Sequence, residues 1–328
     1  MRLTTRGWAT VAAVVLSVLL AVGFGQRSLN AVAAPALAAL VVAAVQVWRA
    51  DAPTVAFDAP RPGFPGQRRD VALAVEGDGL ATVCQPLPPG LTARPIEATV
   101  PLPHTFEREL ALEARGVYDL GPPAVRQRDP LGLVARALEA DATAEVVVYP
   151  QVYTLADPTL GGLLADRATA ERQEFDRLRE YVPGDPLRNV HWKSSAKHDE
   201  YLVMEFSPGE RTETVTVAAE ADDDHTDRMA AAAATVALAA LEAGLTVELA
   251  VPDASLPAGA GDAHRENALR LLAGADGGSV DESVRAAADV SIRAGPEGTS
   301  VRLPEGERSF ESLVTGHERS RAEAEVVG

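Results

Sequence analysis

The residues whose types and spacing could carry chemistry are concentrated in residues 171–206. This segment reads ERQEFDRLREYVPGDPLRNVHWKSSAKHDEYLVMEF, with charged and aromatic residues around a Pro-Gly-Asp turn. A guanidinium beside a carboxylate can form a bidentate ion pair, and an indole ring can cover a guanidinium by cation–π stacking. Such a network would brace two parts of the chain or form a docking surface for a partner or ligand. The candidate residues are Arg179, Glu180, Tyr181, Gly184, Asp185, Arg188, Trp192 and Lys193.

Nucleophilic catalysis is the weakest interpretation of this segment. Ser194 and Ser195 lie near His191 and His198 in the sequence. Nucleophile and base must also be within hydrogen-bond reach in space, which sequence proximity alone does not establish. We therefore expect a protein that is not an enzyme.

A second cluster of candidate residues is acidic. Glu220, Asp222 and Asp224 recur at alternate positions and offer the oxygen ligands that Mg²⁺ prefers. Three carboxylates would overcharge an open cation site, and no serine or threonine pattern accompanies them. Acids after a strand would also repel a phosphate group. We expect a solvated acidic loop without metal or cofactor, with a variant Mg²⁺ site as the minority alternative.

Alternating strand and helix patterns predict the domain that contains this acidic loop. An alanine-rich helix is expected over residues 227–243, ended by Gly244, and Pro257 and Gly259 are expected to lie in a loop. Such alternation predicts an α/β domain, a parallel sheet with helices on both faces. The expected strands are 213–219, 245–251, 289–293 and 298–303, and the other helices are 264–273 and 310–315.

The segment at residues 171–206 is expected to contain a helix and a strand. Phe175, Leu178 and Tyr181 have helical spacing, which predicts a helix that Pro183 ends. Residues 201–206 are expected to form a strand.

Residues 51–150 have the pattern of an antiparallel β-sandwich. Pro/Gly-rich turns separate short runs in which apolar residues alternate, as in Val71, Leu73 and Val75. Residues 131–138 are expected to be a short helix or a loop insertion.

The first fifty residues predict a transmembrane helical hairpin. Residues 8–25 and 31–48 are two uncharged apolar stretches, each long enough as a helix to cross ~27 Å of hydrocarbon. Arg2, Arg6 and Arg49 flank one end of the hairpin and only Arg27 lies in the turn, which favours cytoplasmic termini and a cytoplasmic body. A cleaved signal peptide is the alternative, because the N-terminus is basic and small residues follow the first apolar stretch.

Charge and cysteine content narrow the functional classes. The chain of 328 residues has a net charge of −17, which argues against a nucleic-acid-binding protein. Only two of its 30 basic residues are lysines, a composition typical of proteins adapted to molar salt, although a GC-rich genome gives a similar bias. The single cysteine, Cys84, excludes an internal disulfide.

Residues 175–197 resemble the signature of the DUF 58 family (domain of unknown function 58). The matching positions are Phe175, Leu178, Arg179, Tyr181, Gly184, Asp185, Arg188, Trp192, Lys193, Ser195, Ala196 and Lys197. The resemblance implies a von Willebrand factor A-like domain, although its Asp-x-Ser-x-Ser metal motif is absent here. It also implies a functional association with AAA+ ATPases of the MoxR type.

The sequence thus predicts a multi-domain membrane protein. Its expected parts are a hairpin (1–50), an Ig-like β-sandwich (51–150), the signature segment (151–211), a Rossmann-like von Willebrand A-like α/β domain (212–316) and a flexible tail (317–328). The expected role is a non-enzymatic adaptor or scaffold in the cell membrane, which contacts the lipid bilayer and a MoxR-type AAA+ ATPase. An extracytoplasmic adhesion or envelope-interaction module and a hydrolase of envelope polymers are the two alternatives.

Overall fold

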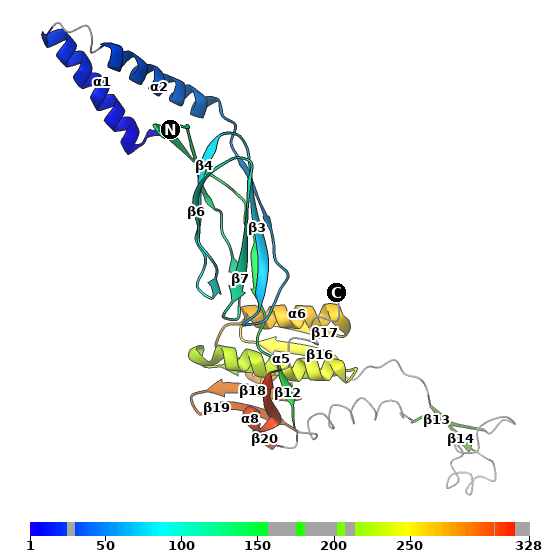
Figure 1. Ribbon diagram of the computed structural model, residues 1–328. Coiled ribbons are helices and arrows are strands. Elements are labelled where there is room, and N and C mark those ends of the chain that lie inside the picture. Colours follow the sequence, from blue (N-terminus) through cyan, green and yellow to red (C-terminus); the bar gives the residue numbers. More distant parts are fainter. Residues whose placement is uncertain (25–29, 157–174, 181–201, 207–213, 305, 319–328) are drawn as a thin grey trace. The chain divides into compact units, whose positions relative to one another are not determined.

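A computed structural model describes residues 1–24, 30–156, 175–180, 202–206, 214–304 and 306–318. The chain divides into two compact units, Met1–Val148 and Tyr149–Gly328. The first unit contains a pair of helices and a β region, and the second contains a mixed sheet with helices (Figure 1).

The first unit begins with the expected helical hairpin. Helices α1 (Thr5–Phe24) and α2 (Asn30–Arg49) pack against each other, and both are long and apolar enough to cross a membrane. Only 6% of the apolar window of α1 and 17% of that of α2 is buried in the protein. The helices therefore present apolar surface outward, which core helices of a soluble domain do not do.

Short strands that alternate buried and exposed residues build the β region of the first unit. Two of its sheets are antiparallel, with strand orders β1-β10-β9-β4-β6 and β2-β3-β7-β5, and strands β11 and β8 form a separate pair. The strands are β1 (Arg2–Leu3), β2 (Thr54–Asp58), β3 (Arg68–Glu76), β4 (Leu80–Gln85), β5 (Leu91–Thr92), β6 (Ile96–Pro101), β7 (His104–Leu112), β8 (Gly116–Asp119), β9 (Ala124–Arg128), β10 (Val134–Glu139) and β11 (Glu145–Val148).

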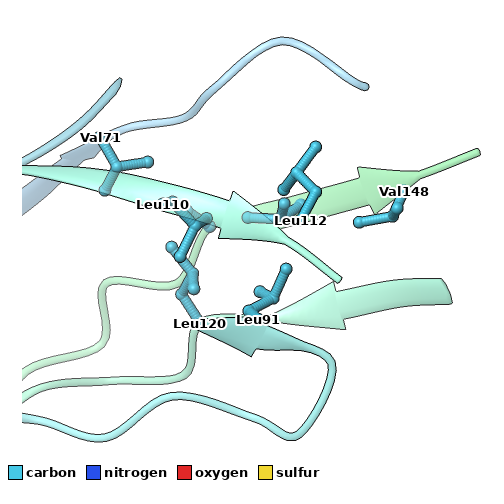
Figure 2. Close-up of a cluster of buried hydrophobic side chains, with 8 residues drawn as sticks. Val71, Leu91, Leu110, Leu112, Leu120 and Val148 are labelled. Carbon is cyan, nitrogen blue, oxygen red and sulfur yellow. The ribbon is translucent and has the colours of Figure 1, made fainter. Parts of the chain in front are cut away.

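Alternation along these strands creates the core of the first unit. One buried cluster takes Leu73 and Val75 from β3 and Ala81 and Val83 from β4, so it joins the two sheets. A second cluster lies further along β7, where Figure 2 shows Leu110 and Leu112 beside Leu91 and Leu120. The expectation of a mostly β region is thus confirmed.

Residues 131–138 differ from the prediction. They include most of strand β10, which pairs antiparallel with β9 and with β1. The prediction failed because Leu133 and Val134 pack with Ala43 and Val47 of helix α2. Long-range packing of this kind overrides local helix propensity.

The second unit is built on a six-stranded sheet of order β17-β16-β15-β18-β19-β20. Only β16, β15 and β18 are parallel to one another, so the expected parallel sheet is instead mixed. The segment expected as a loop around Pro257 is strand β17, which forms a hairpin with β16 and needs no crossover. The strands are β15 (Thr214–Ala221), β16 (Thr246–Val251), β17 (Ala254–Gly259), β18 (Val290–Gly295), β19 (Gly298–Leu303) and β20 (Gly306–Ser309).

Helix α5 (Thr226–Glu242) connects β15 to β16 and is almost entirely buried. Its run of alanines from Ala230 to Ala234 gives it small side chains on every face. It packs against β15, β16, β18 and helix α6. The remaining helices are α6 (Gly261–Gly274), α7 (Glu282–Ala287) and α8 (Phe310–Leu313).

Two separate strand pairs complete the second unit. Strands β12 (Tyr153–Leu155) and β21 (Val314–Glu318) pair antiparallel, as do β13 (Phe175–Glu180) and β14 (Leu202–Phe206). Strand β14 was predicted, whereas the helix predicted from Phe175 is wrong. Three apolar residues do not define a helical period strongly, and β14 provides a partner for the backbone of β13.

Candidate functional site

The signature segment contributes only two of its candidate residues to the described structure. Arg179 and Glu180 lie in β13, opposite Val203 and Leu202 of β14. The other candidates, Tyr181, Gly184, Asp185, Arg188, Trp192 and Lys193, lie outside the described residues. The predicted ion-pair network stays a prediction.

The second candidate site lies at the carboxyl end of β15. The connection from β15 leads through α5 to β16 on one side, and the chain later returns to β18 on the other side. Such a reversal of strand order is where open α/β sheets usually bind ligands. The loop that follows β15 at this position carries the acidic candidates.

The structure gives the first of these candidates, Glu220, a role inside the fold. This residue is 4% exposed and lies near the end of a strand that is buried from Val217 to Ala221. Nη1 of Arg285, on α7, lies 3.2 Å from both carboxylate oxygens of Glu220. Nη1 of Arg293, the β18 residue in register with Glu220, lies 3.6 Å from Oε1. Two guanidinium groups thus compensate one buried carboxylate.

Glu282 extends this ion-pair cluster toward solvent. Its carboxylate pairs with Nη2 of Arg285 one helical turn away on α7. Arg285 therefore bridges an exposed and a buried acid and fixes α7 against the end of β15. This arrangement is structural bracing of the type that the sequence predicted for the signature segment.

The other two acidic candidates do not join Glu220 in a ligand set. Asp222 is exposed, and its backbone N–H donates to the carbonyl of Ala294 at 3.1 Å. Asp224 is exposed in a short 3₁₀ helix, Asp223–His225. Within the described ranges, no group of three or more histidine, cysteine, aspartate or glutamate residues could hold a metal ion. The Mg²⁺ alternative therefore has no support from the described residues.

A glycine-rich segment packs closely across the end of β15. Gly278 exchanges two backbone hydrogen bonds with Ala221, at 3.0 and 2.7 Å. A Cβ on Gly277 would lie 2.7 Å from Cα of Asp223, so this contact requires glycine. The carboxylates of Asp223 and Asp222 lie against Gly277 and Gly295, and the residues of this acidic edge remain exposed. The exposed acids are Asp222, Asp223, Asp224, Asp227 and Asp276.

Sequence reasoning missed Arg285 and Arg293 as partners of Glu220. One signal was available: an acid inside a nearly continuous buried strand requires a compensating charge. The sequence did not say which arginine provides it, because register and crossover geometry decide which side chains meet.

The family described as "Protein of unknown function DUF58" matches residues 177–297, from β13 through β18. None of the curated proteins matches this chain. One solved structure with similarity is the PKD domain of an M14-like peptidase from Thermoplasmatales archaeon SCGC AB-540-F20. It is 14% identical, covers 30% of this chain and 97% of its own, and has a TM-score of 0.24, which supports no conclusion about fold or function.

Proposed function

We propose that this protein is a non-enzymatic adaptor or scaffold, anchored in the cell membrane, that works with a MoxR-type AAA+ ATPase. It would couple the ATPase to assembly or maturation of a membrane or envelope complex. The observation that carries this proposal is a pair of outward-apolar helices fixed to a folded β region. That arrangement suits a protein that holds a soluble body at a membrane surface.

The start of the chain favours retention of the hairpin over cleavage of a signal peptide. Strand β1, which precedes α1, pairs with β10 through Arg2 and Leu3. The hydroxyl of Thr4 donates to the carbonyl of Gly132 at 2.5 Å. Cleavage after the first helix would remove these contacts, which supports a hairpin that is retained in the folded protein.

Several finer features belong to the same proposal. The β region is an Ig-like sandwich, the second unit is von Willebrand A-like, and the high acid content adapts the protein to molar salt. The arginines that flank the hairpin support an orientation with the N-terminus and both soluble units in the cytoplasm. That side is where an ATP-dependent partner finds its nucleotide.

Binding to the ATPase is assigned to the signature segment and the acidic edge of the second unit. The family match covers the acidic edge and the signature segment from residue 177 onward. Arg188, Trp192 and their neighbours combine the cationic and aromatic groups that dominate protein interfaces. The exposed aspartates of residues 222–227 would attract basic groups of the partner and speed its association.

The test is a binding measurement with full-length protein in lipid nanodiscs and the purified MoxR-type ATPase of the same organism. We expect binding in ATP, weaker binding in ADP, and a loss of about tenfold in affinity, or about 1.4 kcal/mol, for Arg188→Ala. The matched control is Arg302→Ala, which removes an exposed arginine of β19. Absence of binding in both nucleotides would refute the adaptor role.

A further inference from the structure

The base of the hairpin contacts the β region at two places, just before α1 and along α2. The N–H and hydroxyl of Thr4 contact the carbonyls of Leu133 and Gly132 at 3.0 and 2.5 Å. On the other helix, Ala43 and Val47 are at most 2% exposed because they pack with Leu133 and Val134. The β9–β10 turn therefore lies where the helices leave the β region.

The lipid boundary of the proposed hairpin falls at the same level. Trp8, in the first turn of α1, and Trp48, at the end of α2, are 63% and 70% exposed. Tryptophan favours the headgroup layer of a bilayer, and flanking arginines favour anionic lipid surfaces. Since Trp8 follows Thr4 by one helical turn, this layer begins about 6 Å along the helix from the β9–β10 turn.

The turn holds one apolar side chain outward at this level. The carboxylate of Asp129, which is 2% exposed, accepts hydrogen bonds from the N–H groups of Leu131 at 2.9 Å and Val134 at 2.6 Å. Gly132 takes a positive φ of 68°, which closes the turn. The backbone of Leu131 is consequently fixed in place, and this residue is 58% exposed.

A basic group lies beside this turn. Nη1 of Arg6 is the atom nearest to the Cβ position of Gly132, at 3.9 Å. An exposed leucine and a nearby arginine on one turn, at the base of a membrane hairpin, match the two components of an anionic bilayer: acyl chains and phosphate headgroups.

We infer that the β9–β10 turn, with Leu131 as its tip, is a membrane-contact site that inserts into the headgroup layer of an anionic bilayer. This inference rests on the proposed membrane anchoring and goes beyond it. It adds a third contact to the two helices and thereby limits rotation of the β region about the hairpin axis.

Quenching of a bimane label by brominated lipids tests this inference on the full chain. Single cysteines are introduced into a Cys84→Ser background and labelled. Each labelled protein is reconstituted in vesicles of phosphatidylcholine, with or without phosphatidylglycerol. Leu131→Cys is the test position. Val15→Cys, in the middle of α1, reports membrane insertion. Glu113→Cys, an exposed position just beyond the far end of β7, is the matched control.

The expected result is quenching of the label at position 131 several-fold above that at 113, and stronger with phosphatidylglycerol present. Strong quenching at 15 with equal, low quenching at 131 and 113 would overturn the membrane-contact site and leave the anchoring intact. Low quenching at all three positions would overturn the anchoring and the contact site together.

Discussion

A charged side chain is buried in each unit of the chain, Glu220 in the second and Arg108 in the first. The two differ in whether groups of opposite charge lie beside them. In the second unit, Glu220 is compensated by Arg285 and Arg293. In the first unit, Arg108 of β7 is 8% exposed, and its three buried guanidinium nitrogens have no hydrogen-bond partner among the described residues. Burial lowers the pKa of Arg108, yet arginine remains charged at neutral pH.

The position of Arg108 explains how this cost is tolerated. Along β7 its inward neighbours are Phe106, which packs on one buried cluster, and Leu110, which belongs to the other. Its methylene groups extend the apolar core while its charged end lowers stability. The comparison shows that a buried charge holds two elements together only where a group of opposite charge pairs with it.

The largest expected effect comes from breaking the compensated site. Arg285→Ala leaves Glu220 buried with only the more distant Arg293. It should destabilise the second unit by about 3 kcal/mol, the low end of the range for breaking a buried ion pair. Hydrogen exchange of β15 in the full chain measures this locally. The control Arg302→Ala removes an exposed pair with Glu307 and should change stability by less than about 1 kcal/mol. An equally small effect of Arg285→Ala would show that this cluster does not brace the unit.

Arg108→Leu should have the opposite sign. Replacing a buried charge without partners by an apolar side chain should stabilise the first unit by about 1–4 kcal/mol. Slower hydrogen exchange of β7 and β3 is the expected result. Arg126→Leu, at an exposed position on β9, is the control and should leave the exchange of β7 unchanged. Faster exchange in Arg108→Leu would show that the guanidinium has a stabilising role.

The buried Tyr149 sharpens the comparison, because a phenol can be buried without charge. Burial, reinforced by Glu266 and opposed by Arg270, raises the pKa of Tyr149 from 10.0 to about 12. Since the raised pKa favours the neutral phenol in the folded state, its contribution to stability is complete below pH 10.0 and is lost as the pH rises toward 12.

The test for Tyr149 is the difference between the tyrosinate absorbance titrations of wild type and Tyr149→Phe. The difference should have a midpoint near pH 12. A midpoint near 10.0, the ordinary value, would mean that the phenol reaches solvent. This effect is the smallest of the three, because it leaves the protein unchanged at neutral pH.

Local patterns predicted most elements but not their long-range partners. Alternation in Val71, Leu73 and Val75 predicted β3, and the alanine-rich run ended by Gly244 predicted α5. The strands β10, β13 and β17 were missed because a partner strand distant in sequence or an adjacent hairpin supplies their hydrogen bonds. A mixed sheet in place of a parallel one follows directly from the missed β17 and from the antiparallel β19 and β20.

The candidate site shows the same limit. The acidic cluster was visible in the sequence, but its members diverge because Glu220 is part of a strand and Asp222 follows its end. The arginines that meet Glu220 lie 65 and 73 positions later and are brought there by the parallel pairing of β15 with β18 and by α7. The spacing of residues in the sequence cannot reveal such a long-range ion pair.

The measurement that tests the account most directly is the membrane topology of the second unit. In a Cys84→Ser background, Asp262→Cys places one thiol at an exposed position of α6. The account predicts that a membrane-impermeant maleimide labels it only after cell lysis, with the unit in the cytoplasm beside its ATPase. Labelling in intact cells would place the unit outside, contradict the adaptor role and favour an envelope-interaction module.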